Sequence, residues 1–165
     1  IFGRYTLGKG TLAPDINVFI QDKLTSKVNL TYFILAEQKW SEALIGFNYS
    51  PKPWLNVGLS TGMEHKDKQY YRCAGSLWAG KGKMSLLVLG ELGQGNKNYW
   101  YKSVLSYNNS DSSNFTFSLV AWRFHGIGPL LTYSPKKNKF SFWIIPAYDP
   151  EFKVSRVMCG IERRF

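Results

Sequence analysis

The chain alternates apolar and polar residues over most of its length, most clearly in residues 53–64. A period of two predicts a β-strand, and about 10 residues is the length that a tilted membrane strand needs. The polar side of this strand is mostly Gly, Ser and Asn, which suits a crowded or water-filled barrel interior, so we expect its apolar side to face lipid. The two sides are Leu55, Val57, Leu59 and Thr61 against Asn56, Gly58, Ser60, Gly62 and Glu64.

The same alternation predicts about twelve extended segments joined by short connections. No helical spacer or linker separates them, so sequential strands should be antiparallel neighbours in one domain, residues 1–165. We therefore predict an all-β fold, a closed antiparallel up-and-down transmembrane β-barrel of about 12 strands, or 10 if the first segment is not a strand. The segments are 1–7, 15–24, 27–37, 43–50, 53–64, 69–78, 84–92, 99–107, 115–122, 127–133, 140–147 and 152–165.

Two features of the pattern are less regular. The stretch LAEQKWSEAL, residues 35–44, is compatible with a helix, although the β-branched and aromatic residues before it favour a strand. Pro129 and Pro146 lie inside predicted strands, where each removes a ladder hydrogen bond. We expect both to lie near a strand end, where a β-bulge accommodates them.

The composition limits the structures with which this chain could cross a membrane. It is 44% hydrophobic and 16% aromatic, yet no stretch approaches the roughly 18 consecutive apolar residues of a membrane helix. A chain without such a stretch crosses the bilayer only as a closed barrel, because its backbone groups must pair between strands. No signal peptide is visible at Ile1, so we expect the numbering to start at a processed mature end.

Charged and aromatic residues favour lipid outside the barrel over water outside it. Charges concentrate in the connections rather than on the strands. Aromatic residues gather toward strand ends, as interfacial girdles require; they are Tyr49, Trp54, Trp78, Tyr99, Tyr101, Tyr107, Tyr133 and Tyr148.

The formal net charge of +10 raises nucleic acid as a partner. However, no nucleic-acid-binding motif is present and the basic residues form no single stripe. They are scattered over the connections, as Lys9, Lys39, Lys52, Lys66, Lys68, Lys81, Lys83, Lys97, Lys136, Lys137 and Lys139. We expect membrane lipids and lipopolysaccharide as partners, and no nucleic acid.

Little in the sequence indicates catalysis. Cys73 and Cys159 fall on the apolar side of distant strands, which favours small fillers over a disulfide. His65 and His125 lie in predicted connections without metal-ligand spacing, and we expect His125 to be a surface loop residue. No GxSxG elbow is present. We therefore predict no enzyme, no metal and no cofactor.

The last residues, VMCGIERRF, place Val157, Cys159, Ile161 and Phe165 on one face of a terminal strand. This resembles the C-terminal signature of bacterial outer-membrane β-barrel proteins, a final strand that ends in an aromatic residue, although Arg163 stands where an apolar residue is usual. The resemblance implies the bacterial outer membrane and recognition by the barrel-assembly machinery through Phe165.

We predict that the polar face encloses a narrow passive channel for ions or small polar solutes, in which acidic and basic groups set a transverse field. Bulky inward positions such as Trp122 and Trp143 should constrict it. Three alternatives remain open: a structural barrel that seats partner proteins in an outer-membrane complex, a soluble ligand-binding barrel and, last, an outer-membrane lipid hydrolase. The predicted pore-lining residues are Asn17, Gln21, Asn29, Glu37, Asn56, Ser60, Glu64, Arg72, Glu91, Lys102, Arg156, Glu162 and Arg164.

Overall fold

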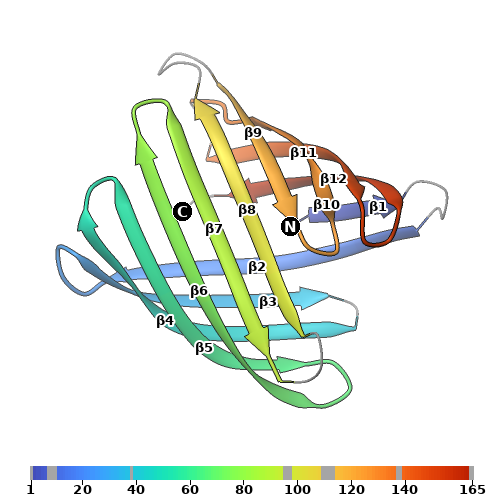
Figure 1. Cartoon of the computed structure of the whole chain (residues 1–165). Helices are drawn as coiled ribbons and strands as arrows, with labels where there is room; N and C mark the ends of the chain where they lie inside the picture. Colours follow the sequence, from blue (N-terminus) through green and yellow to red (C-terminus); the bar gives the residue numbers. More distant parts are fainter. Residues whose placement is uncertain are drawn as a thin grey trace.

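The structure is a computed structural model that describes residues 2–6, 11–37, 39–94, 98–108, 114–136 and 139–163, with side chains from residue 14 onward. Eleven strands follow one another as an antiparallel up-and-down sheet, which confirms the predicted all-β meander (Figure 1). In the described part of the chain, no helix is long and apolar enough to cross a membrane. The strands are β2 (Thr11–Lys23), β3 (Val28–Glu37), β4 (Trp40–Lys52), β5 (Leu55–His65), β6 (Gln69–Lys81), β7 (Met84–Gly93), β8 (Tyr99–Asn108), β9 (Phe115–Trp122), β10 (Gly126–Tyr133), β11 (Phe140–Asp149) and β12 (Val154–Arg163).

The edges of this curved sheet meet at a short additional strand, β1 (Phe2–Thr6). Its backbone pairs with β12, where Gly3 lies opposite Cys159, and with β2, where Gly3 lies opposite Pro14. Because β1 is bonded on both sides, the strand order returns to its start and describes a barrel.

Antiparallel order places alternate connections at opposite ends of the barrel. We call the end that holds the connections after β2, β4, β6, β8 and β10, together with the end of β12, the even rim. The other end, which holds the connections after β3, β5, β7, β9 and β11, is the odd rim.

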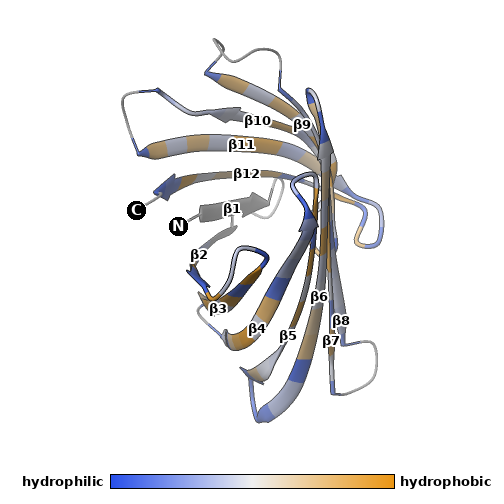
Figure 2. Cartoon of the chain, turned by 90° about the vertical axis from the view of Figure 1, so that its left-hand side faces the viewer, coloured by the Kyte–Doolittle hydropathy of each residue, from blue (hydrophilic) through white to orange (hydrophobic). Residues whose placement is uncertain are grey.

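The strand that dominates the sequence pattern, β5, has the predicted faces. Leu59 is 73% exposed on the outside of the barrel, and Val57 is also exposed. Gly58 is buried on the inside, with Asn56 and Ser60 half-buried beside it. Figure 2 shows this alternation as changes of hydropathy along the curved strands. The small polar side therefore faces the interior.

Glycine is required at Gly46 and Gly58 of this inner face because β4, β5 and β6 crowd there. A Cβ added at Gly58 would overlap the side chains of Asn48 and Ser76, and one at Gly46 would overlap Ser60. The small polar pattern thus reflects close packing of the wall.

The described residues of the ambiguous stretch 35–44 belong to two strands and to no helix, so the helical alternative is wrong. β3 ends at Glu37, β4 begins at Trp40, and Leu35 pairs with Glu42 across them. Leu35 and Glu42 are both buried on the inner face. Tertiary pairing overrides the local helix propensity of this segment.

The prolines are accommodated differently from the prediction. Both project from the exposed outer face, Pro129 in the middle of β10 and Pro146 in the last half of β11. Neither pairing of these strands has a register shift; the shift in the described ladders lies between Tyr49 and Lys52. The expected bulge is therefore wrong. Instead, the ladder between β10 and β11 has no paired residues between Ile127 and Leu131.

Both cysteines are free and exposed. Cys73 and Cys159 lie on the outer faces of β6 and β12, as the alternation predicts. The alternative of a disulfide between them is wrong.

Candidate functional site in the barrel interior

The inner face of β4 to β7 gathers charged residues near the odd rim. Glu42 pairs directly with Glu64 across β4 and β5, and Glu91 pairs with Ala74, two residues beyond Arg72 on β6. Side chains directly opposite or diagonal on one face of a sheet lie within contact distance. The strand register therefore brings three carboxylates around one guanidinium.

Arg72 is the centre of this group. Its Nη1 lies 2.5 Å from Glu64 Oε2, and its Nε lies 2.8 Å from Glu91 Oε2 and 3.2 Å from Glu42 Oε2. The Arg72 side chain is 3% exposed, so these ion pairs are largely removed from bulk water. Burying a charge is costly unless it is paired and hydrogen-bonded, which makes Arg72 the residue on which the three acids depend.

Two neutral side chains orient Glu64. Asn98, from the connection after β7, donates from Nδ2 to Glu64 Oε1 at 2.5 Å and accepts from Arg72 Nη1 at 3.2 Å. Trp40 Nε1 donates to Glu64 Oε2 at 3.1 Å, and the guanidinium of Arg72 lies 5.4 Å from the Trp40 ring centre. We call Trp40, Glu42, Glu64, Arg72, Glu91 and Asn98 the Arg72 cluster.

Sequence reasoning predicted Glu64, Arg72 and Glu91 as inward residues but missed Glu42, Asn98 and Trp40. Glu42 and Trp40 lie in the stretch that was also compatible with a helix, where the sequence did not show which alternate residues point inward. Asn98 precedes β8 and was assigned to a loop. The signal that could have found Glu42 is its even spacing from Leu44 and Gly46 on the inner face of β4.

Beside the Arg72 cluster, Lys102 lies on the inner face of β8, two residues beyond Trp100, which is the partner of Glu91. Its ammonium group is 3.9 Å from the centre of the Trp122 ring, and the His125 ring stacks on Trp122 at 4.0 Å. His125 is buried, so the predicted surface loop residue is wrong. Gly126, with φ at +109°, follows it and lets the turn approach Tyr148 so closely that a Cβ would overlap the backbone. The turn therefore folds against the barrel end.

A second ion pair holds another predicted residue. Arg156 donates from Nη1 to Asp149 Oδ2. Asp149 Oδ1 accepts from the backbone amides of Glu151 at 3.0 Å and Phe152 at 3.2 Å. Arg156 is thus tied to the connection between β11 and β12 at the odd rim.

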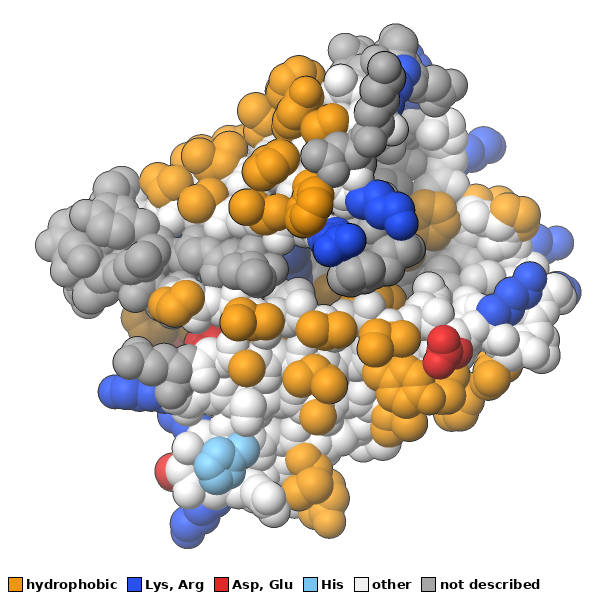
Figure 3. Space-filling view, turned by 180° about the vertical axis from the view of Figure 1, so that it is seen from behind, with side chains coloured by type: hydrophobic (Ala, Val, Ile, Leu, Met, Phe, Trp, Pro, Cys, Tyr) orange, Lys and Arg blue, Asp and Glu red, His pale blue; other side chains and the backbone are white. Residues whose placement is uncertain are grey.

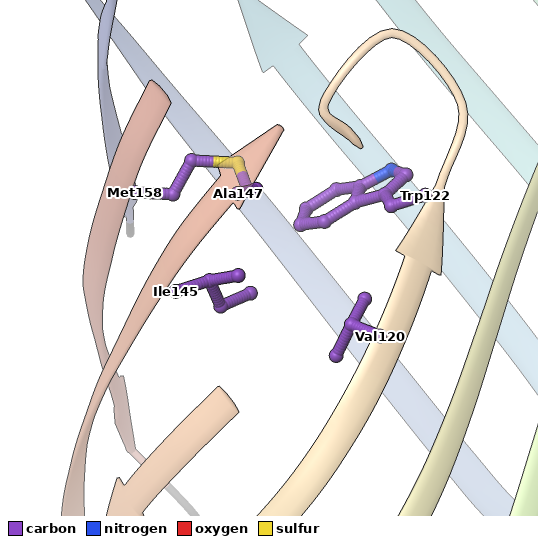
Figure 4. Close-up of a cluster of buried hydrophobic side chains, with 5 residues drawn as sticks. All are labelled: Val120, Trp122, Ile145, Ala147 and Met158. Atoms are coloured by element: carbon purple, nitrogen blue, oxygen red, sulfur yellow. The ribbon is translucent and has the colours of Figure 1, made fainter. Parts of the chain in front are cut away.

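Part of the inner face of β9, β11 and β12 is apolar, in contrast to the wall from β4 to β7. Val120 is 1% exposed, Ile145 2% and Met158 0%. With Trp122 and Ala147 they form one cluster, in which the side chains point toward one another (Figure 4). A water-filled lumen would leave such positions accessible, so this side of the interior is filled by side chains. Trp122, which we predicted to constrict the interior, is part of this cluster.

The other predicted pore-lining residues are more dispersed. Asn29, Glu37, Asn56 and Ser60 are half-buried on the polar wall, where Asn56 Nδ2 donates to Ser50 Oγ at 2.8 Å. Asn17 and Gln21 are exposed on the side of β2 that pairs with inward residues of β3, and Glu162 is exposed near the even rim. Arg164 lies outside the described residues. Among the side chains described, no group of His, Cys, Asp or Glu is arranged to hold a metal ion.

Comparison with known proteins identifies the architecture. No protein-family profile matches the chain, and no curated protein matches its sequence. Among solved structures, it is similar to the KdgM porin in complex with disordered oligogalacturonate, with a TM-score of 0.66. The superposition covers 100% of this chain and 99% of that chain at 13% sequence identity. The fold is porin-like.

Proposed function

We propose that this protein is a closed twelve-stranded barrel of the bacterial outer membrane that forms a narrow passive channel for ions or small polar solutes. The observation that carries the proposal is the pairing of an apolar exterior with an interior wall of buried ions, on a fold shared with a porin over its whole length. In water, so much exposed apolar surface would be costly, whereas lipid favours it.

The exterior supports the membrane assignment. Apolar side chains cover much of the face seen in Figure 3. Exposed aromatic residues lie toward both ends of the strands, as in the girdles of membrane barrels. Those toward the odd rim are Tyr71, Tyr99, Tyr101 and Tyr148, and those toward the even rim are Tyr49, Trp54, Tyr107 and Tyr133.

The interior supports an off-centre passage. Since β9, β11 and β12 contribute a packed apolar cluster, we place the passage along the polar wall from β2 to β7. The Arg72 cluster carries an excess of carboxylates, and Lys102 and Arg156 add basic groups to the inner faces of β8 and β12, so charges of both signs are available to set a transverse field. Besides the Arg72 cluster, six of the predicted pore-lining residues lie on this wall: Asn17, Gln21, Asn29, Glu37, Asn56 and Ser60.

Planar-bilayer recordings test the channel. We expect stepwise currents from the refolded chain. Asn17→Trp, which places a large ring on the exposed inner side of β2, should reduce the conductance of each step. Val18→Trp is the matched control, because Val18 is the next residue and lies on the outer face. Equal currents from the two variants would contradict a passage along this wall.

A structural role is the second candidate, and the dry apolar cluster favours it because that cluster occupies part of the interior. In this role the barrel would seat partner proteins of an outer-membrane complex, after insertion by the barrel-assembly machinery through its last strand. A correctly folded, membrane-inserted barrel that stays silent at all voltages would support this function and contradict the channel. A chain that stays monomeric in solution without detergent would instead support the soluble ligand-binding barrel.

A further inference from the structure

The two rims carry very different charge. In the sequence the charged residues are scattered along the chain, but the fold places most of the acidic ones toward one rim. Among the described side chains, the odd-rim half holds equal numbers of both signs: Lys39, Lys66, Lys68, Arg72, Lys102, Arg123, Lys153 and Arg156 against Asp15, Glu37, Glu42, Glu64, Asp67, Glu91, Asp149 and Glu151. The even-rim half holds Lys23, Lys27, Lys52, Lys81, Lys83, Lys136, Lys139 and Arg163 against Asp22 and Glu162.

The basic side chains of the even rim are exposed. Those in the ion pairs of the odd-rim half, in contrast, include the buried Arg72 and Arg123 and the half-buried Arg156. The net positive charge of the described chain therefore lies at the even rim as accessible ammonium and guanidinium groups. A surface of this kind attracts anions over about 10 Å at 0.1 M salt.

Three successive turns of this rim form a continuous basic arc. The amide of Ser50 at the end of β4 donates to Lys27 O at 2.8 Å, which joins the turn after β2 to the turn after β4. The amide of Gly80 donates to Trp54 O at 2.9 Å, and Lys81 follows Gly80 directly. The amide of Asn108 then donates to Lys83 O at 2.9 Å. We call Lys23, Lys27, Lys52, Lys81 and Lys83 the lysine arc.

The spacing of the arc indicates the kind of anion that it fits. Neighbouring turns are two strands apart, which is roughly 10 Å at about 4.8 Å per strand. Each turn carries one or two ammonium groups, so the charge is spread along the rim rather than concentrated in one pocket. Trp54, 52% exposed, lies between Lys52 and Lys81, as an aromatic ring does at a membrane interface. A row of singly charged lipid headgroups fits this arrangement better than one multiply charged ligand.

We propose that the lysine arc binds the phosphates of anionic glycerophospholipids in the leaflet that the even rim faces. Each lysine near such a surface strengthens the attraction by about fivefold. The proposal goes beyond the channel and rests on the membrane assignment above, so a barrel that inserts but conducts no current leaves it intact.

Fluorescence quenching at Trp54 tests the proposal. The full chain is reconstituted in phosphatidylcholine bilayers that contain either dibrominated phosphatidylglycerol or dibrominated phosphatidylcholine. The emission of Trp54 is taken as the difference between the parent chain and Trp54→Phe. We expect brominated phosphatidylglycerol to be preferred at least fivefold at low salt. In about 1 M salt the preference should approach one, because the Debye length falls to about 3 Å.

Charge variants test whether the even rim causes the preference for phosphatidylglycerol. Lys52→Gln/Lys81→Gln/Lys83→Gln should lose most of the preference, whereas Lys39→Gln/Lys66→Gln/Lys68→Gln removes the same charge from the odd rim and should retain it. If the first variant does not fold, Lys81→Gln alone should lower the preference by about fivefold.

Three results would overturn the proposal: equal quenching by the two lipids in the parent chain, equal losses in the two triple variants, or a Trp54 shielded from both lipids. The last would mean that a protein or a second barrel covers the rim. A salt-insensitive preference would also count against it, because it would show that charge does not select the lipid.

Discussion

Pro129 lies opposite Pro146 across β10 and β11. The register fixes this, because Ile127 pairs with Tyr148 on one side of the two prolines and Leu131 pairs with Ile144 on the other. On their far sides the strands remain fully paired, with Pro129 opposite Leu119 and Pro146 opposite Val157. The amide donors that both prolines lack therefore belong to the same ladder, between β10 and β11, which we call the proline seam. Only this one ladder is interrupted, and the ladders on either side of it are intact.

This seam should be the weakest of the described ladders. We predict that Pro129→Val/Pro146→Val raises the stability of the barrel, because two amide donors are restored and each hydrogen bond contributes about 0.5–1.5 kcal/mol. The midpoint of heat-modifiable gel migration measures the change. Pro51→Val, at the register shift of β4 and outside this seam, is the comparison. A lower midpoint in the double variant would show that the gap is required for the curvature of the wall.

Closure by β1 can be tested with a cysteine that the chain already has. Gly3 is the direct partner of Cys159, and residues directly opposite on antiparallel strands share a face within disulfide range. We predict that Gly3→Cys, in a Cys73→Ser background, forms a disulfide with Cys159 on mild oxidation, detected by mass spectrometry after proteolysis. Adding Cys159→Ser should abolish it. A folded chain that forms no such bond would contradict the pairing of β1 with β12.

Arg72 should be indispensable to the Arg72 cluster. We predict that Arg72→Met destabilises the barrel by about 3–5 kcal/mol, because three largely buried carboxylates lose their shared partner. Urea unfolding in detergent micelles measures the loss. Lys66→Met, at an exposed residue of the same rim, should have little effect.

Charge, rather than packing, should cause that loss. Adding Glu42→Gln, Glu64→Gln and Glu91→Gln to Arg72→Met should recover part of the stability, since neutral amides replace the unpaired carboxylates. If the combined variant is no more stable than Arg72→Met, the role of Arg72 is to fill space.

The two faces of β11 provide a matched test of the apolar cluster around Val120, Ile145 and Met158. Ile145 is 2% exposed on the inside and Ile144 is 44% exposed on the outside. We predict that Ile145→Ala costs about 2–5 kcal/mol, because it leaves a cavity among packed side chains. Ile144→Ala should cost less than about 1 kcal/mol in micelles, where the detergent fills the space. Similar losses from the two variants would mean that the interior is not packed as described.

Most of the architecture could be predicted without coordinates. The alternation in residues 53–64 correctly assigned Leu59 to the outside and Gly58 to the inside, because side chains of a strand alternate whatever their neighbours are. The strand succession and both free cysteines followed from the same rule. The candidate site was predicted in part: Glu64, Arg72 and Glu91 were assigned inward, whereas Glu42 and Asn98 were missed because each lies where the local pattern is ambiguous or ends.

The sequence by itself determined which face of each strand each residue occupies, since that depends on a local period of two. Contacts across strands depend on the register of each strand pair and on the order of the strands. Both are fixed only in the folded sheet. Only the tertiary structure therefore decided that three acids meet at Arg72, that Pro129 meets Pro146, and that His125 stacks on Trp122. For the same reason, the lysines of the lysine arc lie at one rim although they are far apart in the chain, because every second turn of an antiparallel meander returns to the same end.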